Sequence, residues 1–127
     1  MKLIEATSLR CTGESRCRSS QDLRLELNNM QITPSMAKAF ADAIYPGHLF
    51  RFTFSSRRTK NRWGTAWLSE GRLTLYRHSV HVFLHELAHL STREAHTARF
   101  ARELDKLVAA WRPFEVKYER AYAKGKR

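Results

Sequence analysis

The spacing of apolar residues along the chain predicts most of its strands. Residues 49–54 alternate phenylalanine with other side chains, which is typical of a strand with one aromatic face. Residues 63–68 and 72–76 have the composition of two further strands, joined by a short turn that contains Gly71. In residues 23–27 three leucines alternate with charged residues, so a short half-buried strand is expected there as well.

A helix is predicted to follow Thr33 and to continue as far as Tyr45. Thr33 is a favourable N-cap, and Pro34 is tolerated at the first helical position. The helix should end at Tyr45, because Pro46 and Gly47 follow. Its apolar face, which we expect in the core, consists of Met36, Phe40 and Ile44.

Two longer helical patterns follow. The run Ser79–Ser91 has apolar residues around much of its surface, so it is expected to form a buried helix. A second helix is predicted over His96–Trp111, where apolar residues recur at helical spacing. Pro113 is expected to end that helix, because proline lacks the amide hydrogen that an interior position needs. Residues 114–122 then predict a short last helix.

The length of 127 residues is that of one domain, which we expect to span residues 31–123. Residues 1–22 show no clear hydrophobic period, so residues 1–30 are expected to be a poorly defined N-terminal segment with at most one short strand, and 124–127 form a basic tail. Cys11 and Cys17 are expected to be free thiols, because two cysteines provide neither a four-ligand zinc site nor a disulfide framework; a local disulfide or a partial metal site is the alternative. Without a long apolar run or the apolar core of a signal peptide, the chain is predicted to be cytoplasmic and not bound to a membrane.

Candidate chemistry is concentrated in the run His85-Glu86-Leu87-Ala88-His89, inside the first of the two longer helical patterns. Residues four apart in a helix are offset by only about 40°, so His85 and His89 point the same way and can hold one metal ion. Glu86 lies about 100° round the helix axis from His85, where its carboxylate is poorly placed as a ligand but can face a water on the metal. The pattern is typical of a zinc hydrolase. A helix with two ordinary histidines is the alternative.

A catalytic zinc usually takes three protein ligands and leaves one position for water. The candidates for the third ligand are Glu94, His96, Glu103 and Asp105. His96 is preferred, because the short segment after the motif can reverse the chain and because imidazole is the commoner match. Glu103 lies about two helical turns beyond His96 and could reach the same side, so it is the main alternative.

The positive charge of the chain is unevenly distributed. The net charge is +11, and residues 31–127 carry eighteen basic and eight acidic groups, a net +10. This excess suits a polyanion or an acidic substrate, and a solvated basic surface would look the same. A basic loop precedes Trp63, and it is either a solvated hairpin tip or a DNA-binding loop in which bases stack on the tryptophan. Its basic residues are Arg57, Arg58, Lys60 and Arg62.

Several of these features together resemble the SprT-like and YgjP-like zinc metallopeptidases. They are Arg62-Trp63-Gly64-Thr65, the strand from Gly71 to Leu75, the motif His85–His89, and His96 with Phe100 four residues on. The resemblance covers roughly residues 36–111, and it departs from the family at Thr65-Ala66, at the spacing of the third histidine and in lacking a four-cysteine ribbon. It implies one zinc ion per chain on the three histidines, with Glu86 as general base. It also implies a compact α+β zincin fold, with a small, mostly antiparallel sheet of three to four strands packed on the motif helix and flanking helices.

The expected function is that of a small zinc endopeptidase acting on a protein or peptide substrate. The strand over residues 72–76 would pair with the extended substrate. Some members of the family digest DNA-crosslinked proteins, which implies DNA-associated substrates here. One alternative is a nucleic-acid-binding protein with a structural zinc, which needs a fourth ligand such as Glu94 or Glu103. Another is a regulatory protease that cleaves one partner, such as a phage-type repressor. Candidates for stabilising the oxyanion are Tyr76, His78 and Tyr118.

Overall fold

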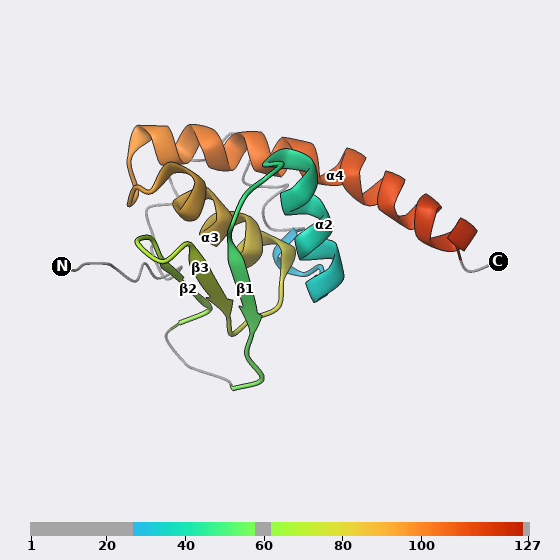
Figure 1. Ribbon diagram of the computed structural model, residues 1–127, viewed down its shortest axis with the longest axis horizontal. Coiled ribbons are helices and arrows are strands. Elements are labelled where there is room, and N and C mark those ends of the chain that lie inside the picture. Colours follow the sequence, from blue (N-terminus) through green and yellow to red (C-terminus); the bar gives the residue numbers. More distant parts are fainter. Residues whose placement is uncertain (1–26, 58–61, 126–127) are drawn as a thin grey trace.

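The computed structural model describes residues 27–57 and 62–125, and their arrangement is α+β (Figure 1). A helix, three strands and two further helices follow one another along this part of the chain. Helix α3 packs against the sheet through β2 and β3, and it also packs against α4. The elements are α2 (Pro34–Ile44), β1 (Arg51–Phe54), β2 (Gly64–Trp67), β3 (Arg72–Leu75), α3 (Val80–Thr92) and α4 (Ala98–Gly125).

The three strands form a mixed sheet in the order β1-β3-β2. Strand β2 pairs antiparallel with β3, and the turn between them contains Gly71 at a φ of 62°. Strand β1 pairs parallel with β3, with Arg51 opposite Arg72. The expectation of a mostly antiparallel sheet is therefore wrong for one of the two pairings. A parallel pair needs a crossover of a dozen or more residues, and residues 55–71 provide it.

The predicted boundaries of α2 are confirmed. The Thr33 hydroxyl accepts a hydrogen bond from the Met36 amide at 3.2 Å, and Tyr45 is the C-cap. Phe40, from the predicted apolar face, is fully buried, and Met36 and Ile44 are partly buried against the core.

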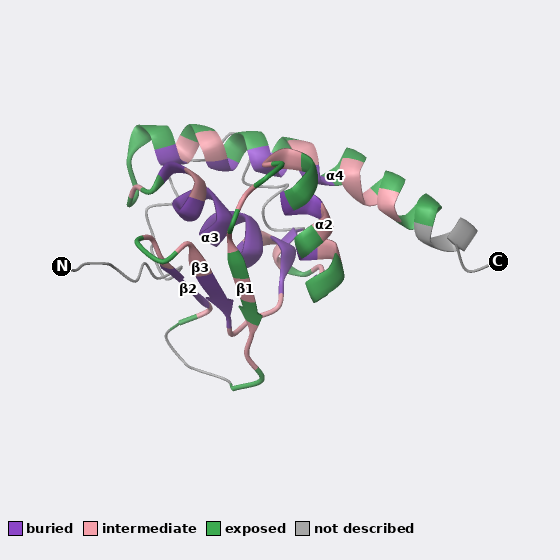
Figure 2. Cartoon of the chain, viewed as in Figure 1, coloured by how far each residue is buried: buried purple, intermediate pink, exposed green. Residues whose placement is uncertain are grey.

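Helix α3 forms the centre of the core, as its apolar pattern predicts. Ser79 caps it, with the hydroxyl accepting a hydrogen bond from the Val82 amide at 3.1 Å. Figure 2 shows α3 buried along most of its length, with the sheet and α4 packed around it. The metal-motif residues are thus held on a buried helix that neighbouring elements pack on several sides.

Helix α4 continues through Pro113, so the prediction that this proline ends the helix is wrong. The two aromatic residues beside the proline explain why the helix persists. Trp111 and Phe114 both pack on Phe40 of α2, with ring centroids 5.2 Å and 5.1 Å apart. This packing holds the chain in line on both sides of the proline, and the end of α4 extends past the rest of the fold (Figure 1).

Some expectations fall on residues outside the described part of the chain. These include Cys11, Cys17, Arg58 and Lys60, and most of the strand expected over residues 23–27. Leu27, the last residue of that stretch, is helical instead of extended and is fully buried. Among the described helices, none combines the length and the apolar composition needed to cross a membrane.

Candidate metal centre

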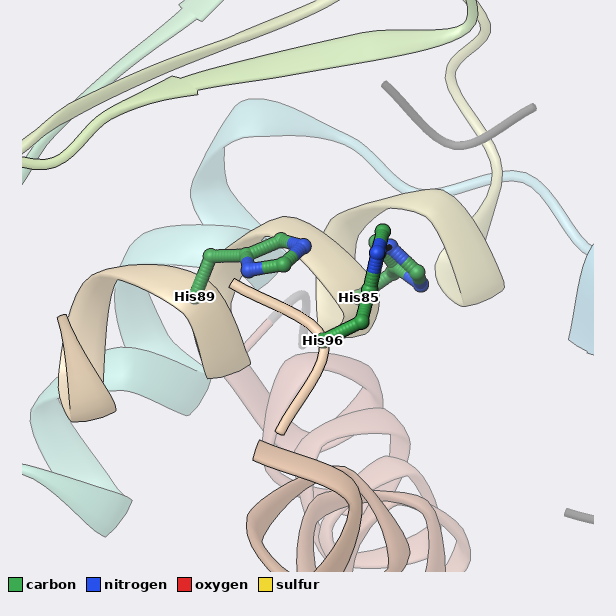
Figure 3. A group of neighbouring side chains, drawn as sticks. All are labelled: His85, His89 and His96. Carbon is green, nitrogen blue, oxygen red and sulfur yellow. Dashed lines mark hydrogen bonds between the residues drawn. The ribbon is translucent and has the colours of Figure 1, made fainter. Parts of the chain in front are cut away.

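Three histidine side chains converge where α3 ends and α4 begins (Figure 3). His85 and His89 project from successive turns of α3, and His96 approaches from the segment between the helices. The Nε2 atoms of His85 and His96 are 3.4 Å apart, and one ligand nitrogen from each histidine lies within 4.8 Å of the others. His85 and His89 are buried, whereas His96 is exposed. The cluster can hold a metal ion and has one side near solvent.

Hydrogen bonds fix the chain reversal that returns His96 to α3. Arg93 adopts a left-handed conformation with a φ of 59°, and its amide donates to the His89 carbonyl at 2.7 Å. The Thr92 hydroxyl accepts from the Glu94 amide at 3.2 Å. Thr97 starts the next helix, because its hydroxyl accepts from the amide three residues on. The third histidine is therefore placed by a tight helix-to-helix connection.

The orientation of His89 is set by the backbone of Glu94. The Nδ1 atom of His89 lies 2.7 Å from the Glu94 carbonyl oxygen, and because a carbonyl only accepts, Nδ1 carries the proton. Nε2 then holds the lone pair that a metal needs, and it is buried without a hydrogen-bond partner. The pKa of His89 is lowered to about 4, mainly by burial and to a smaller extent by the nearby His96, while the bond to Glu94 opposes the shift. The ring is accordingly neutral at pH 7.

Phe100 packs among the three imidazoles. Its ring stacks on that of His89 at a centroid distance of 4.2 Å and an interplanar angle of 17°. Its centroid is also 5.1 Å from that of His85 and 5.2 Å from that of His96. The helical spacing predicted Phe100 as part of the core stripe of α4. In the structure its ring also packs against all three histidines and supports the cluster.

Glu86 is fully buried in α3, and Gly64 at the start of β2 lies against it. A Cβ at residue 64 would lie 2.9 Å from Glu86 Cγ, 3.1 Å from its Oε2 and 2.8 Å from Val82 Cγ1. Only a glycine allows the strand to approach the carboxylate this closely without a shift. Sequence reasoning did not assign this role, although a glycine within a strand pattern is a general sign of close backbone approach.

The other candidates for a third ligand lie apart from the cluster. The Glu103 carboxylate accepts from the Tyr45 hydroxyl and pairs with Lys106. The Glu94 carboxylate accepts from Thr97 and pairs with an arginine of α4. Asp105 is exposed on α4. Within the described residues, only the three histidines form a group with the spacing of metal ligands.

Strand β3, which was expected to pair with substrate, lies between β1 and β2 and is hydrogen-bonded on both sides. The expectation is wrong because a central strand has no free edge for a further strand. Of the two edge strands, β2 packs against α3 and begins beside Glu86. Strand β2 therefore replaces β3 as the candidate for pairing with an extended substrate.

The remaining predicted residues are held by contacts elsewhere in the fold. His78 Nε2 is 2.8 Å from the Ser55 carbonyl oxygen, and Tyr118 stacks on Phe114 in the part of α4 after Pro113. Tyr76 lines a hollow at the end of the sheet together with His78. These positions do not support a role for the three side chains at the oxyanion.

The described part of the basic loop borders the same hollow. Arg57 and Arg62 are exposed, and Trp63 is half-buried with the Arg77 guanidinium 4.4 Å from its ring centroid. Arg62 and Trp63 line the hollow, and Arg57 follows two serines that also line it. The described ends of the basic loop, Arg57 and Arg62, therefore lie at the end of the sheet.

Comparison of the chain with models of protein families, with curated proteins and with solved structures gave no match. The function of the site is therefore inferred from its geometry.

Proposed function

We propose that this chain is a zinc-dependent endopeptidase that uses Glu86 as its general base. The observation that carries the proposal is the state of His89. Its Nε2 atom is buried without a hydrogen-bond partner and belongs to a three-histidine group. A buried polar atom in this situation costs stability unless a ligand satisfies it, and a metal ion does so.

The spacing of the nitrogens supports zinc. Zinc binds histidine nitrogens at 2.0–2.1 Å with tetrahedral geometry, so two such nitrogens lie about 3.3 Å apart. The Nε2 atoms of His85 and His96 are 3.4 Å apart. Three histidines with an open fourth position are also a ligand set of catalytic zinc. Copper and nickel accept imidazoles too, so metal analysis is part of the test.

A bound zinc supplies a Lewis acid that polarises the scissile carbonyl and lowers the pKa of water to around 7. Glu86 follows the first histidine ligand in α3, and in the proposed reaction it accepts a proton from the attacking water. It then passes that proton to the leaving amine. The close packing of Gly64 holds the Glu86 side chain in one place during both transfers.

The substrate of the proposed enzyme is an extended segment of protein. Among the described strands β2 lies at an edge of the sheet, so a substrate strand can pair with it without breaking the pairs described. The net charge of +10 in residues 31–127 supports substrates associated with DNA, since such a surface is attracted to the phosphate backbone.

The main rival is a nucleic-acid-binding protein with a closed, structural zinc site. Such a site needs four protein ligands. In the described part of the chain the metal-ligand group has three members, and His96 is exposed. These features favour an open site. Cys11 and Cys17 lie outside that part of the chain, so their contribution as zinc ligands is tested separately with a double variant.

The test combines metal analysis with hydrolysis of an unfolded protein such as casein. The wild type should hold one zinc per chain and cleave the substrate. Glu86→Gln should keep the zinc and lose nearly all hydrolysis, because the amide is almost isosteric but cannot accept the proton. His96→Ala should lose both the zinc and the activity.

Two control variants separate the proposal from its alternatives. Glu103→Ala should keep the zinc. If Glu103→Ala loses the zinc and His96→Ala keeps it, Glu103 is the third ligand. The double variant Cys11→Ser/Cys17→Ser should keep zinc and activity. Loss of zinc from this variant, or full hydrolysis by Glu86→Gln, would count against the proposed enzyme.

A further inference from the structure

A hollow of about 510 Å³ opens at the end of the sheet, where β1 and β3 end and β2 begins. Its size is in the range of small-molecule sites in proteins. The lining residues that matter here are Ser55, Ser56, Arg62, Trp63, Arg77 and His78. None of them belongs to the metal cluster.

The hollow is cationic. Arg62 and Arg77 line it, and none of the described residues lining it is acidic. Arg77 forms no ion pair with the described residues, and its guanidinium lies over the Trp63 ring and reaches the Asn28 carbonyl at 3.5 Å. A guanidinium placed in this way keeps several N–H donors for an anion.

Backbone contacts hold the walls of the hollow in place. The amides of Tyr76 and Arg77 both donate to the Trp63 carbonyl, at 2.8 Å and 2.9 Å. The Ser55 amide donates to the Leu75 carbonyl at 2.9 Å, and the Ser55 carbonyl lies 2.8 Å from His78 Nε2. Three segments of chain are thus tied together before any ligand arrives, which reduces the entropic cost of binding.

We propose that this hollow binds single-stranded nucleic acid, with one backbone phosphate between Arg62 and Arg77 and an unpaired base against Trp63. Arginine suits phosphate because its planar fork donates parallel hydrogen bonds to two oxygens. The Ser56 hydroxyl lies in the same wall and adds a further donor. Trp63 and Tyr76 supply aromatic surface for a base, and such stacking tolerates any sequence.

A single strand fits better than a duplex for two reasons. The aromatic residues line a concave site, which an unstacked base can enter and a paired base cannot. The described basic residues of the loop also lie at the hollow, because Arg62 lines it and Arg57 directly follows Ser56, which lines it too. The charges of Arg57 and Arg62 can then attract neighbouring phosphates while the hollow holds one nucleotide.

The test measures fluorescence anisotropy of a labelled oligothymidylate of about fifteen nucleotides over a range of salt concentrations. The metal-loaded Glu86→Gln full-length protein is used, and a chelator-treated sample is run beside it. Affinity should be the same in both samples, because the hollow does not contain the histidines. Binding therefore succeeds or fails independently of the proposed hydrolysis.

Arg62→Gln/Arg77→Gln should weaken binding at least about tenfold. It should also flatten the log–log salt slope by up to about 1.4, since each single-strand phosphate contributes about 0.7. The matched control, Lys117→Gln/Arg120→Gln, removes the same charge from the exposed end of α4 and should change both quantities far less. Trp63→Leu should weaken binding about five- to tenfold and leave the slope unchanged, because stacking releases no counterions.

Three results would overturn the inference. The first is equal binding by the arginine variant and the α4 control. The second is competition by a polyglutamate peptide as strong as that by unlabelled oligothymidylate, which would make the hollow a site for acidic protein segments. The third is full competition by millimolar inorganic phosphate together with no effect of Trp63→Leu, which would make it a simple anion site. Arg62→Gln alone, at an exposed position, carries the test if the double variant does not fold.

Discussion

Phe100 stacks face to face on the imidazole of His89, with the ring centroids 4.2 Å apart. A second contact constrains the same imidazole, because its Nδ1 donates a hydrogen bond to the Glu94 carbonyl. One contact fixes the plane of the ring, and the other fixes which nitrogen is protonated. Together they aim Nε2 of His89 at the other two histidines before a metal arrives.

Replacing Phe100 with leucine should lower the affinity for zinc by about ten- to a hundredfold, the range found when supporting residues around a metal ligand are changed. Leucine keeps an apolar side chain but loses the flat surface against His89. Zinc affinity is measured by competition with a chelator. Leu107→Ala is the control, since Leu107 is fully buried in α4 and does not belong to the cluster. It should cost about 2–5 kcal/mol of stability and leave zinc affinity unchanged, and equal affinity losses in the two variants would remove Phe100 from a specific role.

Gly64→Ala should impair hydrolysis far more than stability. The added Cβ would meet Glu86 Cγ at 2.9 Å, so either β2 or the carboxylate must move. A displacement of about 1 Å at a catalytic group can reduce the rate about a hundredfold. The readout is kcat on an unfolded protein substrate, with zinc content measured on the same sample.

Gly71→Ala is the matched control for this prediction. Gly71 has a φ of 62° in the turn between β2 and β3, so alanine there is strained and should cost about 1 kcal/mol. It lies at the far end of β3 from the residues that touch Glu86, and kcat should be unchanged. A Gly64→Ala variant with wild-type kcat would show that Glu86 tolerates the shift.

The metal-free protein should lose stability as the pH falls from about 6.5 to about 4. Burial lowers the pKa of His89 to about 4, against 6.5 in the unfolded chain. Between these values the unfolded state binds a proton that the folded state does not, so acid favours unfolding. The full difference corresponds to about 3 kcal/mol, and below pH 4 this contribution no longer changes.

The measurement is urea denaturation of chelator-treated protein at pH 7 and pH 4.5, for the wild type and for His89→Gln. Because other groups titrate in the same range, the difference between the two proteins isolates the contribution of His89. The wild type should lose about 2–3 kcal/mol more than the variant. Equal losses would mean that His89 is protonated in the folded state at its ordinary pKa.

Much of this fold follows from local signals in the sequence. The ends of α2 could be predicted because Thr33, Pro34 and Pro46-Gly47 act on neighbouring backbone groups only. The pairing of His85 with His89 could be predicted for the same reason, since helical geometry alone sets it. Such features do not depend on how the rest of the chain packs.

Other features depend on contacts between residues far apart in the sequence. The parallel pairing of β1 with β3 is set by the path of the crossover, which hydrophobic alternation does not encode. Glu94 was considered for its carboxylate, yet the structure uses its carbonyl to orient His89. The role of Gly64 depends on Glu86, twenty-two residues later in the chain. None of these relationships produces a repeating pattern along the sequence.

Pro113 shows tertiary packing prevailing over a local signal, and this gives a further prediction. The proline leaves the Ala109 carbonyl without its usual amide donor, and Ala109 is exposed, so water can replace that donor. Pro113→Ala would restore the hydrogen bond and remove the clash of the ring with the preceding turn. Removing the proline relieves a helix-interior penalty of about 3 kcal/mol. It also frees the unfolded chain from the restriction that proline imposes, which destabilises the folded state by about 1 kcal/mol. Alanine should therefore stabilise the protein by about 2 kcal/mol.

Urea denaturation followed by circular dichroism measures the change, with Arg120→Ala as the control at an exposed position of the same helix. The control should alter stability by less than about 0.5 kcal/mol. Phe114→Ala should instead destabilise the protein by up to about 3 kcal/mol, since it removes the ring that packs on Phe40 beyond the proline. If Pro113→Ala is neutral or destabilising, the proline contributes to placing Phe114 on Phe40. If Phe114→Ala has no effect, the aromatic contacts do not explain why α4 continues through Pro113.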